Sequence, residues 1–245
     1  MKFNRFIICF FITALIVGAT GCVTNTNTNT NTNTNTKTET NNVELDDAKH
    51  VTVNVNMGAG QLDIQSGSNK LMEGEFIYNV QEWEPTVEYS KTGKYGTLNL
   101  EQSSFTKNNL GVKNRNDWNL KLNKEISTDL ILLLGAGNGN FRLNGMNLEK
   151  VQVKMGAGKL DMDLSGNWKK NFSVNVIGGV GSTSIILPRS IGVIVNATQG
   201  IGKISADGFK LSGDYYVNDA YGKSGITMSV MIKTGVGEIN LKLTP

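Results

Sequence analysis

Apolar and polar residues alternate over short stretches on both sides of a Gly-x-Gly unit that recurs six times. Apolar residues stand five and three positions before each first glycine and six positions after it, and most residues between them are polar. A period of two is typical of strands that bury one face, so each repeat is predicted to be a strand, a glycine corner and a second strand. The glycine pairs are Gly58 and Gly60, Gly135 and Gly137, Gly156 and Gly158, Gly179 and Gly181, Gly200 and Gly202, and Gly235 and Gly237.

The spacing of these corners predicts a solenoid. The first glycines follow one another at intervals of 77, 21, 23, 21 and 35 residues, which is a period near 21 with two insertions. Two corners and two strands per repeat describe one coil of an all-β solenoid of about six coils. Glycine suits the corners because it accepts positive φ and lets neighbouring backbones approach closely. An antiparallel β meander or sandwich would have glycine corners at the same spacing and remains the alternative. The second corners are expected at Gly67, Gly145, Gly166, Pro188 and Gly208.

Two insertions interrupt the repeat. The larger, at about 67–125, has strand-like alternation of its own and precedes a coil whose outward residues Ile131 and Leu133 are apolar. We therefore expect this insertion to fold over those two side chains. The smaller insertion, at about 207–225, contains three tyrosines and is predicted to be a projecting hairpin or loop.

Several motifs in this region occur together in a recognisable order. They include Met57-Gly-Ala-Gly-Gln-Leu-Asp, Met155-Gly-Ala-Gly-Lys-Leu-Asp, Leu187-Pro188 and Val217-Asn218-Asp219-Ala220-Tyr221. Residues 43–245 thereby resemble the toastrack domains of bacterial envelope proteins. The resemblance implies a single-stranded right-handed β-helix and an association with envelope stress, and it implies little chemistry.

The N-terminus has the layout of an export signal. Lys2 and Arg5 precede Phe6–Ala19, an apolar run of 14 residues with only Thr13 as a polar interruption. This run is shorter than the roughly 20 residues of a membrane-spanning helix, so a signal peptide over 1–21 is the better interpretation. The run ends in Ala19-Thr20-Gly21-Cys22, which resembles a bacterial lipobox and implies a lipid on Cys22. We expect an extracytoplasmic protein anchored to a bacterial membrane, with an ordinary secreted protein as the alternative.

The segment 22–42 is predicted to be a disordered tether. Thr and Asn alternate strictly from Thr24 to Thr36, and such a tract has nothing apolar to bury. It would hold the following domain a short distance from the lipid surface.

Composition excludes several function classes. Loss of Lys2 and Arg5 with the leader reduces the formal net charge from +3 to +1, so no electrostatic case for nucleic acid remains. Cys22 would be lipidated and His50 is the sole histidine, which argues against a metal site and a Ser-His-Asp triad. The corner glycines lack the third glycine of a dinucleotide-binding loop, so no cofactor is expected.

Asp63 and Asp161 occupy equivalent repeat positions, but the intervening coil offers Asn140, so a solvated face is expected there rather than a calcium site. We predict a non-enzymatic module that binds an envelope protein or a wall polymer. Its aromatic candidates for an interaction surface are Trp83, Tyr215, Tyr216 and Tyr221. The alternatives are an enzyme that cleaves wall glycan with surface carboxylates, and an assembly protein whose last coil caps against another chain.

Overall fold

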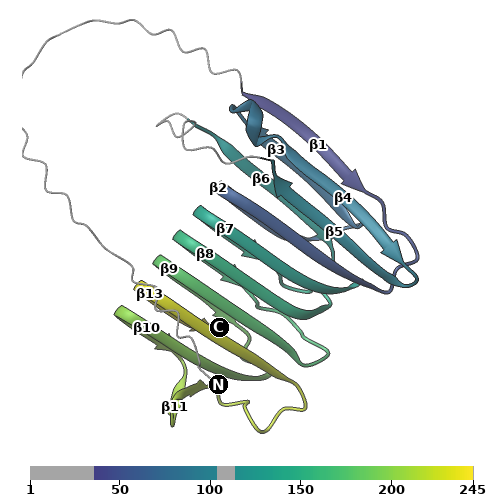
Figure 1. The fold of residues 1–245 in the computed structure, drawn as a ribbon. Coiled ribbons are helices and arrows are strands. Elements are labelled where there is room, and N and C mark those ends of the chain that lie inside the picture. The colour runs from purple at the N-terminus through teal and green to yellow at the C-terminus, as the bar shows by residue number, and fades with distance from the viewer. Residues whose placement is uncertain (1–35, 104–113, 245) are drawn as a thin grey trace, which may run out of the picture. The chain divides into compact units, whose positions relative to one another are not determined.

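The computed structural model describes residues 36–103 and 114–244 of the chain. These residues form a sheet of thirteen strands, ordered β1-β3-β6-β2-β7-β8-β9-β13-β10-β12-β11, with β5 paired to β2 and β4 paired to β5 (Figure 1). The elements are β1 (Lys37–Val43), β2 (His50–Ser68), β3 (Met72–Tyr78), the 3-10 turn η1 (Gln81–Trp83), β4 (Pro85–Thr92), β5 (Tyr95–Gln102), β6 (Asn116–Asn123), β7 (Ser127–Arg142), β8 (Leu148–Asp163), β9 (Phe172–Leu187), β10 (Gly192–Asp207), β11 (Lys210–Ser212), β12 (Tyr215–Val217) and β13 (Thr227–Leu243).

Six long strands, β2, β7, β8, β9, β13 and β10, each carry a Gly-x-Gly unit in their middle. They lie side by side (Figure 1). They run parallel, and the glycines of neighbouring strands are in register. The predicted all-β solenoid of six glycine-cornered coils is therefore confirmed. Parallel pairing excludes the antiparallel meander for these strands.

The glycine corner changes which residues of a strand point inward. In β2 the buried residues before the corner are odd-numbered, such as Val53 and Val55, and those after it are even-numbered, Leu62 and Ile64. The shift lets both arms of the bent strand present apolar side chains to one hydrophobic core. Of the eighteen apolar repeat positions, all but Ala197 and Ala206 are buried, and these two pack at the edge of that core.

The order of the coils differs from their order in the sequence. β13, the last strand, lies between β9 and β10, so β10 is the terminal coil of the stack. The smaller residues Ala197 and Ala206 belong to this outer coil, where less core needs filling. The hypothesis that the last coil of the sequence caps against another chain is wrong in this respect, because that coil is internal.

The corners pack backbone against backbone. Gly158 has φ +135°, and a Cβ atom there would lie 1.7 Å from the carbonyl oxygen of Gly137 in the next coil. Gly156 has no unusual φ, but a Cβ there would lie 2.4 Å from the carbonyl oxygen of Gly135. The second glycine of each unit is thus required for conformation and space, and the first glycine is required for space in the five units from Gly135 onward.

The larger insertion extends the sheet. β6 pairs with the second arm of β2 and β5 pairs with its first arm, while β3 and β4 continue outward from them. The expectation that this insertion covers Ile131 and Leu133 is wrong, since Leu133 is 38% exposed. The insertion completes pairing at the free edge of β2 instead of lying over a face that is already formed.

The corner of β2 has no coil beside it on that side, and side chains take over the missing backbone contacts. Gln102 Oε1 accepts the Gly58 N–H at 2.8 Å, and the Asn116 amide donates to the Ala59 carbonyl at 2.7 Å. Asn116 is buried and also accepts the Trp118 indole N–H. Together they form a polar cap over the first corner.

The ordered domain begins before residue 43. Lys37–Val43 form β1, which pairs antiparallel with β3, and Tyr78 donates a hydrogen bond to Glu39 at 2.5 Å. The expectation of a disordered tether up to residue 42 is therefore wrong for its last six residues, because a neighbouring strand satisfies their backbone groups. The leader, Cys22 and the rest of the tether lie outside the described residues. Within the described ranges, no helix has the length and apolar character needed to cross a membrane.

Candidate functional site

The outward side chains of the first arms form rows across the coils. Because the corners are in register, residues at the same distance before the first glycine lie next to one another on neighbouring strands. A groove of about 620 Å³ crosses three of these rows on β8, β9, β13 and β10. Its lining is Lys150, Gln152, Ser173, Val174, Asn175, Ile194, Asn196, Tyr215, Ser229, Val230, Met231 and Lys233.

Amide side chains mark the middle of this groove. Gln152 and Asn175 are register partners on β8 and β9, and Asn196 lies on β10 beyond Met231 of β13. Asn175 Oδ1 is buried without a hydrogen-bond partner among the described residues. Buried polar atoms are normally paired, so this amide is one that a ligand group or water would satisfy.

The groove is positively charged. Lys150 and Lys233 both line it, and neither side chain forms an ion pair or hydrogen bond with a described residue. None of its lining residues is an aspartate or glutamate. The arrangement therefore favours an anion over a cation.

Tyr215 forms one wall of the groove. It lies on β12, which pairs antiparallel with the first arm of β10 and with β11, so the smaller insertion is a hairpin as predicted. Buried Asn218 fixes the end of this hairpin, since its side chain accepts the Val193 N–H and donates to the Ile191 carbonyl. Tyr215 is 45% exposed and its position is set by regular structure.

The other aromatic candidates lie elsewhere. Tyr216 packs against the hydrophobic core, and Tyr221 is exposed but does not line the groove. Trp83 is only 3% exposed, so its assignment to an interaction surface is wrong. It is the last residue of η1 and its ring packs inward. Only Tyr215 of the four lies on the groove.

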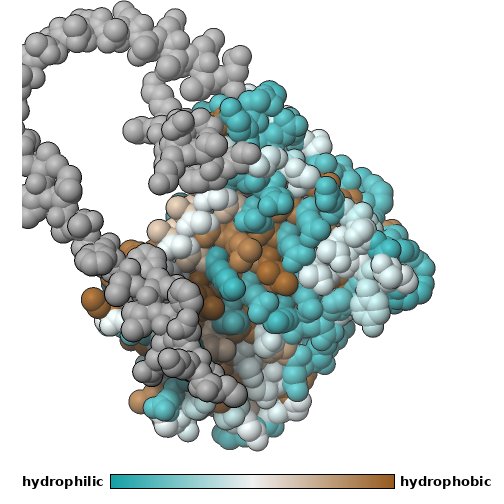
Figure 2. All heavy atoms as spheres, viewed as in Figure 1, coloured by the Kyte–Doolittle hydropathy of each residue, from teal (hydrophilic) through white to brown (hydrophobic). Residues whose placement is uncertain are grey.

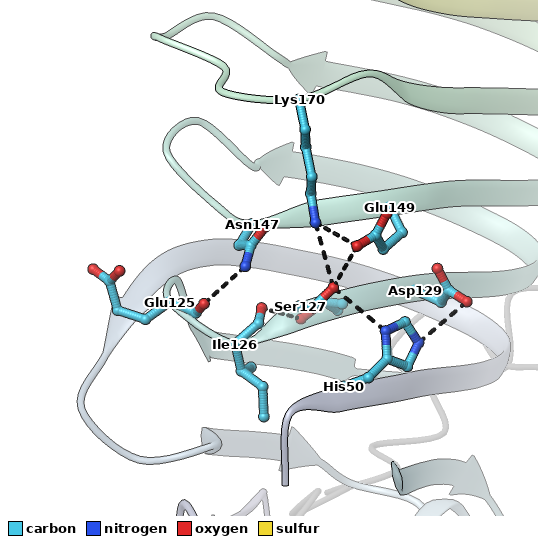
Figure 3. A network of polar contacts seen from close by, with 9 residues as sticks. His50, Glu125, Ile126, Ser127, Asp129, Asn147, Glu149 and Lys170 are labelled. Carbon is cyan, nitrogen blue, oxygen red and sulfur yellow. Dashed lines mark hydrogen bonds and ion pairs between the residues drawn. The ribbon is translucent and has the colours of Figure 1, made fainter. Parts of the chain in front are cut away.

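A second polar cluster lies where the long strands begin (Figure 3). His50 Nδ1 lies 3.4 Å from Ser127 Oγ, and His50 Nε2 lies 3.4 Å from Asp129 Oδ2. The structure thus brings together the three residue types of a hydrolase triad, which the sequence interpretation did not expect. The sequence does indicate that His50 and Ser127 lie together, because both stand eight positions before the first glycine of their coils.

Glu149 and Lys170 complete this cluster. The register between β7 and β8 shifts at Thr128, which leaves Glu149 as a bulge residue that turns toward Ser127. Ser127 donates to Glu149 at 2.7 Å, and Lys170 donates to both residues (Figure 3). The Lys170 ammonium, followed by the Ser127 hydroxyl, holds the pKa of Glu149 below its usual value.

The geometry of this cluster suits a structural role. The Ser127 hydroxyl directs its proton to Glu149 rather than to His50, so the histidine is not placed as its base. β7 lies between β2 and β8, and its backbone N–H groups are used in sheet pairing instead of facing an oxyanion. The cluster joins β2, β7, β8 and the segment before β9.

Asp63 and Asp161, where a solvated face was expected rather than a calcium site, do not form a continuous column of carboxylates. Asn140 lies between Asp63 and Asp161 in the register and donates to Asp63 at 2.7 Å, while Asp161 pairs with Lys159 at 2.6 Å. Each carboxylate therefore has its own partner and the two do not act together. Among residues 36–103 and 114–244, no three His, Cys, Asp or Glu side chains are grouped as metal ligands would be.

An apolar area lies beside Lys154, near the glycine corners. Leu133 and Ile177 line a shallow depression of about 410 Å³, with Lys154 between them. In the view of Figure 2, apolar atoms gather over part of the sheet and polar side chains border them. This depression is shallower than the groove beside Tyr215 and lacks its amides.

Comparison with known proteins places the chain in a family. The family described as the N-terminal domain of toast_rack, DUF2154, matches residues 31–186. This match covers more than half of the chain, so the protein belongs to the toast-rack N-terminal domain family. No curated protein matches the chain.

One solved structure agrees with the fold. The crystal structure of a "putative cell adhesion protein" from Clostridium sporogenes ATCC 15579 is 41% identical, covers 85% of this chain and 100% of its own, and has a TM-score of 0.83. A "putative adhesin" from Bacteroides fragilis NCTC 9343 is 11% identical over 84% of this chain and 97% of its own, with a TM-score of 0.25. Another "putative adhesin", from Parabacteroides merdae ATCC 43184, is 11% identical over 85% of this chain and 97% of its own, with a TM-score of 0.24. Nothing about this chain follows from the last two at such TM-scores.

Proposed function

We propose that this protein is a non-enzymatic binding module of the bacterial cell envelope, held at the outer face of a membrane by a lipid on Cys22. The lipobox-like Ala19-Thr20-Gly21-Cys22 supports the anchor, and the toast-rack family supports an extracytoplasmic interaction role. The similar protein from Clostridium sporogenes carries the name of a cell adhesion protein, which points the same way.

The groove beside Tyr215 is the observation that carries this proposal. Its side chains project from parallel strands with a shared core beneath them, and rigid strands hold binding groups more accurately than loops do. It combines an aromatic wall, amides and two free lysines. These groups recognise a ligand, and none of them is arranged to break a bond.

A glycan-cleaving enzyme is the less favoured alternative. Such enzymes use two carboxyl groups on either side of the scissile bond. The groove lining contains no carboxylate, and the Asp63 and Asp161 carboxylates are engaged separately. A link to envelope stress rests on the family resemblance, and growth of a deletion strain under wall-active antibiotics tests it.

Anchoring is tested by labelling growing cells with a clickable palmitate analogue. The wild-type chain should take up label and sediment with membranes, and Cys22→Ser should take up none. Label on Cys22→Ser, or an unlabelled wild-type chain, would refute the lipid anchor.

Binding is tested with the secreted Cys22→Ser protein and isolated envelopes. We expect saturable retention that Tyr215→Ala abolishes and Tyr221→Ala, a matched change in the same insertion, leaves intact. No saturable retention, or equal loss in both variants, would argue against this groove as the binding surface.

A further inference from the structure

The chemistry of the groove identifies the class of its ligand, and this step rests on the proposed binding function. We infer that the groove beside Tyr215 binds an anionic polysaccharide, a polymer that presents many hydroxyl groups together with carboxylate or phosphate charges.

Hydroxyl recognition is the first part of this inference. Gln152, Asn175 and Asn196 present amides that each donate and accept hydrogen bonds, and Ser173 and Ser229 add hydroxyls one row away. These side chains lie on parallel strands about 4.8 Å apart. Gln152 and Asn175 are direct neighbours and Met231 separates Asn175 from Asn196, so the polar groups form a short array across the strands with one apolar interruption. A polymer with repeating hydroxyl groups matches such an array.

The aromatic wall is the second part. Tyr215 stands at the β10 side of the array and is 45% exposed, and Ile194 of β10 lines the groove with it. A tyrosine ring offers an apolar face and a polar tip. A sugar ring has the matching combination of C–H faces and hydroxyl edges.

Charge is the third part. Lys150 and Lys233 lie in the groove, and Lys154 lies in the same row as Lys233 with Ile177 between them. None of the three side chains has an ion pair or hydrogen bond with a residue in the described ranges. A neutral glycan would leave these cations without counter-charge, and a run of acidic residues would supply the charge but not the repeated hydroxyl groups.

The inference predicts selectivity between three soluble polymers, measured by calorimetry with the secreted Cys22→Ser protein. Polygalacturonate carries hydroxyls and charge, dextran carries hydroxyls without charge, and polyglutamate carries charge without hydroxyls. We expect polygalacturonate to bind at least about tenfold more tightly than either other polymer, and its affinity to fall with added salt.

Paired variants locate the binding. The double variant Lys150→Gln and Lys233→Gln should lose at least about tenfold in affinity for polygalacturonate. Lys203→Gln with Lys242→Gln removes the same charge from exposed positions outside the groove and should change affinity less than about twofold. Circular dichroism of each variant checks that the sheet is intact.

Three results would overturn the inference: polyglutamate that binds as tightly as polygalacturonate, no binding of polygalacturonate, or equal loss in the two lysine pairs. If polygalacturonate fails while retention on isolated envelopes still depends on Tyr215, the ligand class is wrong and the binding function stands. If both fail, the groove is not a binding surface.

Discussion

The Gly158 corner fits against Gly137 so closely that a Cβ atom on Gly158 would lie 1.7 Å from the Gly137 carbonyl oxygen. The same relationship recurs between Gly181 and Gly158. Stacked glycine corners therefore set the distance between coils, and the core behind them depends on that distance.

Gly158→Ala should destabilise the domain by more than about 4 kcal/mol, because the obstructing atom is backbone and the whole stack would have to shift. Gly145→Ala is the matched control. Gly145 also has positive φ, +75°, but nothing lies within 4 Å of an added Cβ, so only the conformational cost of about 1–2 kcal/mol applies. Urea unfolding measures both. Equal effects of the two substitutions would mean that close packing at the corner contributes nothing.

Asn116→Ala should remove the polar cap over the first corner. It leaves the Ala59 carbonyl and the Trp118 indole N–H without this partner, and we expect a loss of about 2–4 kcal/mol in the free energy of unfolding. Asn119→Ala alters the same strand on its outward face, where the amide contacts Glu75, and should change stability by less than about 0.5 kcal/mol. An unchanged free energy of unfolding in Asn116→Ala would show that the first corner needs no cap.

Tyr78→Phe should loosen β1. The Tyr78 hydroxyl is buried and donates to Glu39, and both burial and that carboxylate raise its pKa, so it remains a donor at neutral pH. Loss of this bond should cost about 1–2 kcal/mol and speed amide exchange in Lys37–Val43 before the rest of the sheet. Tyr95→Phe, at a 69% exposed position, is the control. Unchanged exchange in β1 would contradict this role for Tyr78.

Glu149→Gln should have a pH-dependent effect on stability. Its folded pKa is lowered from 4.5, so its contribution is present above the unfolded pKa and lost as pH falls through the folded value. Because the side chain is 44% exposed, the expected cost near neutral pH is below about 1 kcal/mol, shrinking to nothing in acid. Glu125→Gln, at an 81% exposed side chain, should show neither effect. A cost that grew in acid would contradict the assigned direction.

Much of the fold was predictable because each coil repeats the same alternation of apolar and polar residues around a Gly-x-Gly unit. The alternation around Gly58 and Gly135 determines which side chains enter the core, and their equal offsets place His50 beside Ser127. The amide row of the groove follows from the same offsets. Sequence spacing therefore determines the rows of outward side chains as well as the core.

The position of the last coil was not predictable from spacing. Parallel strands accept any neighbour with matching corners, so the repeat does not say that β13 enters between β9 and β10. Ala197 and Ala206, small residues where other coils carry larger ones, are the only trace of β10 as the outer coil. The placement of Tyr215 depends on that order and on the β11–β12 hairpin, so it needed the structure.

Photo-cross-linking in living cells tests the central claim most directly, with benzoylphenylalanine placed at Tyr215 in the full-length chain and at Tyr221 as the control. A light-dependent product of higher mass in the envelope fraction at Tyr215, and none at Tyr221, is the predicted result. No product at Tyr215, or equal products at both positions, would contradict a binding groove beside Tyr215.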